Sequence, residues 1–294
     1  MAELPVRSTD YYFARGDLVL QVGNVLFRIH RDILSVHSSF FSDMFRTASS
    51  NGHEGSSDNC PLKLTQDLSS VESFTILCSM LYPKKIGLLP PVLAGELDTW
   101  APVLEATQAL QMDSAQKYIL SKLEEDRLNI PSVAARLLGL IINYEEASDI
   151  LKLECIHSLV TRRGAILAPE AHVLGPEIMA LISSIRDRIR VLAASRSWVA
   201  IPRHPLCKGE LDSACQFAIH AGVLANLRID PIKYSSSSHD GFMSSIFDVP
   251  KDDRVCRYCD SIRMELACTG IGEVGLYDEI RRCAVGLKLL KGGD

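Results

Sequence analysis

Apolar residues near the start of the chain recur at every second position, which predicts a β-hairpin. Leu18, Leu20 and Val22 alternate with Val19 and Gln21, and a period of two is typical of strands. Gly23 and Asn24 follow this strand, and a leading Gly suits a tight two-residue turn. The apolar face of the returning strand would consist of three residues: Val25, Phe27 and Ile29.

The spacing of apolar residues changes after residue 30 and predicts two short helices. Ile33, Leu34 and His37 fall on one side of the first helix. Ser38 is placed to cap the second helix, in which four apolar residues recur at helical spacing: Phe40, Phe41, Met44 and Phe45.

The following residues predict a polar loop, a further strand and further helices. Residues 47–61 are polar and rich in Gly and Ser, so we expect a mobile loop there. The alternation in residues 62–64 predicts a third strand of the same sheet. Helices are expected to begin at Ser70, at Trp100 and at Asp113, with Asp113 as a cap.

From residue 130 onward the pattern is that of one helix after another. The predicted helices cover residues 132–144, 145–162, 176–195, 213–227, 256–268 and 277–290. A second polar loop is expected at residues 231–241, and no internal repeat is present. Strands followed by a long run of helices indicate an α+β protein.

The hairpin and the two helices contain a long ordered motif: Asp17, Phe27, His30, Arg31, Leu34, Ser38, Phe41, Met44 and Phe45. Together with the run Met80-Leu-Tyr-Pro83, this motif resembles the BTB (POZ) domain. The resemblance implies a small three-stranded sheet with a cluster of helices over residues 10–125, followed by a mostly α-helical C-terminal region. We expect His30 to be a hydrogen-bonded structural histidine, and Asp17 to cap the hairpin or to pair with a basic group.

The helical part of the chain carries a second resemblance. Residues 167–190 are similar to the region that follows the BTB domain in an expanded fungal group, mainly from mushroom-forming fungi, which is loosely comparable to the BACK region. The resemblance implies a BACK-like helical region at residues 126–200 and a C-terminal helical region at residues 201–294.

Charge and hydropathy limit the partners and the location that we expect. The formal net charge is −5 and no basic cluster exceeds two residues, so the basic face that nucleic acid requires is not visible. The N-terminus lacks the apolar core of a secretory signal, and no apolar run is long enough to span a membrane. We therefore expect a soluble intracellular protein, cytoplasmic or nuclear, whose nine cysteines are reduced or bind metal.

Four of these cysteines are candidate ligands of one structural zinc ion: Cys207, Cys215, Cys256 and Cys259. The last two form a C-x-x-C pair at a predicted helix start, where the helix dipole favours thiolates. Four thiolates can form a closed tetrahedral site. The C-x7-C spacing of the first two is uncommon for zinc, so reduced and partly buried thiols stay open as the alternative, as does His204 as a substitute ligand.

Catalytic motifs are absent from the sequence, and we expect no enzymatic activity. The segment Gly270-Ile-Gly272-Glu-Val-Gly275 matches G-x-G-x-x-G, but a dinucleotide site also needs a strand before it and a second strand after it. The acidic runs at residues 124–126 and 145–146 would point apart on a helix, so they make poor acid–base pairs. The sequence contains no G-x-S-x-G nucleophile elbow, no H-E-x-x-H zinc-protease motif, no Walker A P-loop and no set of kinase motifs.

The resemblance implies a non-catalytic protein–protein interaction module that acts as an adaptor or scaffold. Its expected contact surface is Asp43, Met44 and Phe45, with core packing as the alternative for Met44 and Phe45. The partner would be a second copy of the chain or another protein, including a cullin if the chain is a substrate adaptor of a ubiquitin ligase. Cullin adaptors carry a hydrophobic-x-Glu motif after this helix, and Glu54 lacks the hydrophobic residue, which counts against a cullin.

Domain-swapped BTB dimers need a longer N-terminal segment before the hairpin. Only 16 residues precede Asp17 and Pro5 interrupts them, so we do not expect that swap, and a monomer or a different dimer stays open.

Two functions of another class remain as alternatives: a cysteine-dependent enzyme, and a DNA-binding regulator that reads DNA through a zinc module.

Overall fold

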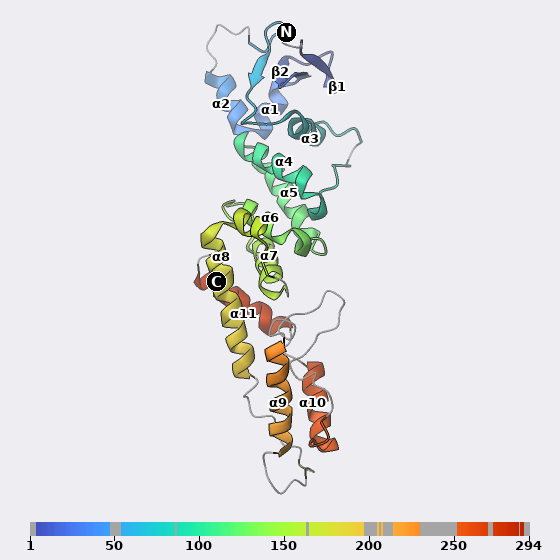
Figure 1. The fold of residues 1–294 in the computed structure, drawn as a ribbon. Helices are drawn as coiled ribbons and strands as arrows, with labels where there is room; N and C mark the ends of the chain where they lie inside the picture. The colour runs from blue at the N-terminus through green and yellow to red at the C-terminus, as the bar shows by residue number, and fades with distance from the viewer. Residues whose placement is uncertain are drawn as a thin grey trace. The chain divides into compact units, whose positions relative to one another are not determined.

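The computed structural model describes residues 4–47, 54–85, 87–162, 165–196, 205, 207, 214–229, 252–269, 273–287 and 289–290 (Figure 1). The chain forms two compact units. The first comprises Met1–Val133 with Tyr144–Ser148, and the second comprises Ala134–Asn143 with Asp149–Asp294. Each unit is described by itself.

The first unit contains a four-stranded sheet in the order β1-β3-β2-β4. The predicted hairpin is present as β2 (Leu18–Val22) and β3 (Val25–Ile29), which pair antiparallel. Gly23 between them has φ +55°, a left-handed conformation that glycine adopts without strain. The predicted third strand is β4 (Leu62–Leu64), which pairs parallel with β2.

The three-stranded prediction missed β1 (Val6–Tyr12), which pairs parallel with β3 at the edge of the sheet. Most of its side chains are exposed, so it lacks the apolar alternation that makes a strand visible in the sequence. Contacts outside the strand hold it in place. Tyr12 donates a hydrogen bond to Asp58, and Arg7 pairs with the same carboxylate at 2.7 Å.

Asp58 belongs to a segment that we expected to be a mobile loop. Residues 54–61 instead form hydrogen-bonded turns, in which the Gly55 N–H donates to the Cys60 carbonyl at 2.7 Å. The Gly55 carbonyl in turn accepts from the N–H of Val19 in β2 at 2.7 Å. A polar composition favours a loop, but it does not say whether tertiary hydrogen bonds order that loop.

The two predicted helices after the hairpin are α1 (Arg31–His37) and α2 (Ser39–Thr47). Asp17 accepts the N–H of Arg31 at 2.9 Å, so a residue from before β2 caps α1 in place of the preceding His30. Ser38 caps α2 as predicted, since its Oγ accepts the N–H of Phe41 at 3.1 Å. The same Oγ donates to the Leu110 carbonyl at 2.6 Å, which links α2 to a later helix.

Three longer helices complete the first unit: α3 (Val71–Leu81), α4 (Leu97–Ala109) and α5 (Asp113–Glu125). A 3₁₀ turn, η1 (Ala94–Glu96), precedes α4. Ser70, where the helix was predicted to begin, is the cap of α3, because its side chain accepts the Ser73 N–H. Asp113 is the first residue of α5 and not its cap, since the capping position is Met112.

The core of the first unit lies where the sheet meets these helices. The Phe27 ring of β3 and the Phe74 ring of α3 are both buried and lie edge to face at 4.9 Å. Phe41 and Leu34 are fully buried as well, which accounts for their place in the sequence motif. Val19 is buried although it points away from Leu18 and Leu20, so β2 is covered on both faces.

The second unit is helical in every described part that has regular structure. Its helices are α6 (Ile130–Ile141), which begins in the first unit, α7 (Asp149–Thr161), α8 (Ala168–Arg196), α9 (Ala214–Ile229), α10 (Arg257–Thr269) and α11 (Glu273–Gly286). Gly175 has φ +74° and divides α8 into two parts. The predicted start at Pro176 therefore marks the second part, because proline favours the first turn of a helix.

The expected loop at residues 231–241 lies outside the described residues, as do residues 270–272 of the G-x-G-x-x-G segment. Gly275 lies in α11, and the helix α10 rather than a strand comes before that segment. No described helix is both long enough and apolar enough to cross a membrane.

Candidate functional site

The surface formed by α1 and α2 exposes apolar side chains. Val36 at the end of α1 is 78% exposed, and Phe40 and Met44 of α2 are half-buried. Exposed and half-buried apolar side chains that lie close together on one surface are a feature of protein-binding sites. We call Val36, Phe40, Asp43 and Met44 the α1–α2 surface.

The three predicted contact residues differ in their surroundings. Asp43 is exposed and pairs with Arg46 at 2.8 Å. Met44 is half-buried, so its side chain is neither in the core nor fully exposed to solvent. Phe45 is engaged by its own domain, since its ring stacks on Phe41 at 5.9 Å and the Arg31 guanidinium lies 4.9 Å from its centre.

Sequence reasoning missed Val36, which has the highest exposed fraction of the residues in this surface. The predicted inward side of α1 was Ile33, Leu34 and His37, and Val36 falls outside it. Leu34 is buried as expected, but His37 is exposed, so its placement on that side was wrong. The spacing of residues alone could not identify Val36, because single apolar residues are common on protein surfaces.

The pair His30-Arg31 of the sequence motif serves the fold. The His30 ring stacks on Phe13 at 5.7 Å, and its backbone N–H donates to the Tyr82 hydroxyl at 3.0 Å. The expected side-chain hydrogen bond is not seen at Nδ1, which is buried without a partner. Arg31 donates to the Glu54 carbonyl at 3.3 Å, so it connects α1 to the turn that follows α2.

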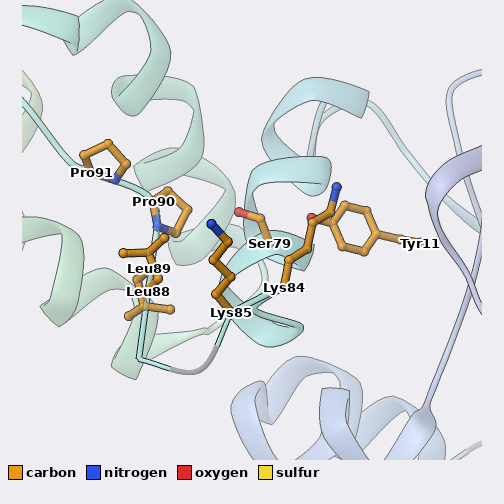
Figure 2. A pocket seen from close by; sticks show the side chains of 8 residues that line it. All are labelled: Tyr11, Ser79, Lys84, Lys85, Leu88, Leu89, Pro90 and Pro91. Carbon is orange, nitrogen blue, oxygen red and sulfur yellow. The ribbon is translucent and has the colours of Figure 1, made fainter.

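A shallow pocket of about 350 Å³ lies on the first unit between β1, the end of α3 and the connection to α4 (Figure 2). Figure 2 shows Lys85, Leu88 and Pro90 on that connection, across from Ser79 and Tyr11. Two of the polar side chains that line it have structural partners: Ser79 donates to the Ile76 carbonyl, and Lys84 pairs with Asp10 at 2.8 Å. These contacts assign Ser79 and Lys84 a structural role.

The four cysteines singled out in the sequence lie together in the second unit. The sulfur atoms of Cys207, Cys215, Cys256 and Cys259 are all within 4.8 Å of one another. Cys207 precedes α9, Cys215 is the second residue of α9, Cys256 immediately precedes α10 and Cys259 lies in its first turn. His204, the substitute ligand, lies outside the described residues, as do residues 212 and 213.

Backbone N–H groups point at two of these sulfurs. The Cys256 N–H donates to the Cys215 sulfur at 3.4 Å, and the Cys259 N–H donates to the Cys256 sulfur at 3.5 Å. The first bond favours the thiolate of Cys215, but burial and the neighbouring sulfurs of Cys256 and Cys207 together raise the pKa of that thiol. The sulfur atoms of Cys207 and Cys256 are 3.7 Å apart, which is too far for a disulfide bond.

Two other cysteines have a different character. Cys78 and Cys155 are fully buried, one in each unit, and burial strongly raises the pKa of both thiols. A buried thiol with a raised pKa behaves as a small apolar side chain and is chemically inert. These two cysteines are therefore packing residues.

The comparisons with known proteins agree with the geometry of the first unit. The BTB/POZ domain family model matches residues 12–127. The comparison with curated proteins yields no match. The chain thus contains a BTB/POZ domain, a class of protein–protein interaction module, followed by a mostly helical C-terminal region.

Proposed function

We propose that the protein is a non-catalytic adaptor or scaffold whose BTB domain binds a protein partner through the α1–α2 surface. The exposure of Val36 on α1, together with the half-buried Phe40 and Met44 on the contacting helix α2, is the observation that supports this surface most. Burial of these side chains against a partner would remove apolar area from water, which favours binding by about 25 cal/mol for each Å² buried. Asp43 at the rim would contribute to the choice of partner.

The alternative within this proposal is substrate adaptor of a cullin-based ubiquitin ligase. The α1–α2 surface supports either role, because both need an exposed apolar patch near the end of α2. Glu54 follows α2 in the chain, and Arg31 binds its backbone carbonyl. The absence of a hydrophobic residue two positions before Glu54 favours a scaffold over a cullin adaptor.

The test is affinity capture of the tagged full-length chain from its own cells, followed by mass spectrometry, with Met44→Asp as the variant. A charged side chain at a half-buried surface position leaves the core intact, so the variant is expected to fold and to lose its partner. Leu88→Asp is the matched control, because Leu88 is an exposed apolar residue of the same unit that lies at the pocket and not on α1 or α2.

The proteins that are recovered decide between the roles. Recovery of a cullin and ring-type subunits by wild type and Leu88→Asp, but not by Met44→Asp, would establish the ligase adaptor. Recovery of an untagged copy of the chain, or of non-ligase proteins, by wild type and Leu88→Asp but not by Met44→Asp would establish the scaffold. Capture that is equal for wild type and Met44→Asp would contradict the α1–α2 surface.

A further inference from the structure

We propose that Cys207, Cys215, Cys256 and Cys259 bind one zinc ion as a closed tetrahedral tetrathiolate site that fastens α9 to α10. This inference goes beyond the interaction function and does not depend on it. It concerns residues of the second unit, whereas the α1–α2 surface belongs to the first.

The separations of the sulfur atoms fit a metal site. In a tetrahedron with Zn–S bonds of about 2.3 Å, the sulfurs are about 3.8 Å apart. The Cys207 and Cys256 sulfurs are 3.7 Å apart, and all four sulfurs lie within 4.8 Å of one another. Small side-chain rotations would bring the longer separations to the tetrahedral value, since each cysteine sulfur moves on a single rotatable bond.

The type and the number of ligands indicate zinc in a structural role. Thiolates are soft ligands, and a mononuclear set of four is typical of structural zinc sites. A catalytic zinc site keeps one coordination position open for water or substrate. Here the cluster contains four sulfur ligands, so the ion would have no open position.

The local backbone stabilises the negative charge that such a site carries. Cys215 lies in the first turn of α9, and Cys259 lies in the first turn of α10. The N-terminal end of a helix carries partial positive charge. The N–H groups of Cys256 and Cys259 already donate to cluster sulfurs, and hydrogen bonds of this kind orient and stabilise metal-bound ligands.

The packing between α9 and α10 explains what the ion would do. In the described residues the apolar core at this place consists of four buried residues, one of which is a ligand: Ala218, Ile219, Val255 and Cys259. Such a small core rarely holds two helices together without a cross-link. A metal that joins residues on both sides of the connection between α9 and α10 would supply that cross-link.

The primary test is the metal content of the full-length chain, purified under reducing conditions, with cysteine alkylation mapped by mass spectrometry. We expect about one zinc ion per chain. We also expect the four cluster cysteines to be protected from alkylation until a strong chelator removes the metal. Cys78 and Cys155 serve as internal controls, because their protection comes from burial and would not depend on the chelator in the folded BTB domain and α7.

Single substitutions add a second line of evidence. Cys215→Ser and Cys256→Ser are expected to lose the zinc, and the exposed Cys60→Ser is expected to retain it. Reconstitution of chelated wild type with cobalt(II) should give the intense visible absorption of a tetrahedral thiolate complex, which does not require the variants to fold. Metal-free protein that takes up neither zinc nor cobalt, and whose cluster thiols react equally with and without chelator, would overturn the proposal. Bound iron in place of zinc, or a disulfide within the cluster under reducing conditions, would overturn it as well.

Discussion

Replacement of Ser38 by alanine should destabilise the BTB domain far more than a replacement at its exposed neighbour. Ser38 is 1% exposed, and its hydroxyl makes two hydrogen bonds, to the Phe41 N–H and to the Leu110 carbonyl. Loss of a helix N-cap costs about 1 kcal/mol. A buried carbonyl left without its partner costs about 1–3 kcal/mol. Because one side chain supplies both bonds, we expect a combined loss of about 2–4 kcal/mol.

The matched control is Ser39→Ala. Ser39 is exposed and donates its hydroxyl hydrogen to the side chain of Gln111 at 2.7 Å, so its loss should cost at most about 0.5 kcal/mol.

Urea unfolding can be followed by the fluorescence of the buried Trp100 in a Trp198→Phe background, because the chain has two tryptophans. Residue 198 lies outside the described residues.

With an m-value of about 2 kcal/mol per M, the midpoint of Ser38→Ala should fall by about 1–2 M urea at unchanged slope. A midpoint shift equal to that of Ser39→Ala would refute the reasoning, because it would mean that the two buried hydrogen bonds contribute nothing. A changed slope would indicate instead that the unfolding is no longer two-state.

Three further variants test other parts of the structure. In Gly16→Ala the new Cβ would lie 2.9 Å from the backbone of Arg28, so we expect a loss of about 1–3 kcal/mol in urea unfolding, against almost none for Gly95→Ala, where the nearest atom is 3.8 Å away. Phe27→Ala removes a fully buried ring and should cost about 3–5 kcal/mol in the same assay, and a loss below about 1 kcal/mol would contradict the packing. Glu170 accepts two hydrogen bonds from Arg162 at 2.7 Å, which, with the Leu167 N–H, lower its pKa. Because the folded-state pKa is lowered, the Glu170 carboxylate adds stability at pH values above its unfolded-state pKa of about 4.3. This stability is lost as the pH falls from that value through the lower, folded-state pKa. Thermal melting of Glu170→Gln followed by circular dichroism should therefore lack this acid-dependent loss, and an unchanged pH profile would rule the contribution out.

Local patterns in the sequence predicted the elements whose signal is local. The change of period after residue 30, the Gly23 turn, the cap at Ser38 and the start of a helix at Ser70 each depend on a few neighbouring residues, and the structure confirms them. Elements held by distant partners were harder to predict. The strand β1 has a polar sequence and depends on its pairing with β3 and on Asp58, so nothing within residues 6–12 identifies it.

The same distinction applies to the candidate sites. The C-x-x-C pair of Cys256 and Cys259 was visible because its spacing is local, whereas the approach of Cys207 to Cys256 depends on how the chain returns after α9. For the α1–α2 surface, helical spacing identified Leu34 as inward, but it also placed the exposed His37 there. It did not report how deeply Met44 and Phe45 are covered. The Arg31 guanidinium lies over the Phe45 ring, and a contact of this kind cannot be read from a periodic pattern in the sequence.

The sequence by itself determined the α+β class and the helical remainder, because hydrophobic periodicity and caps act over a few neighbouring residues. The motif between Asp17 and Phe45 carried the resemblance to the BTB domain. Only the tertiary structure decided that the sheet has four strands, that Asp17 caps α1, that Val36 is exposed and that four cysteine sulfurs lie together. These features depend on contacts between residues far apart in the chain. Such contacts form only when the fold brings their partners together.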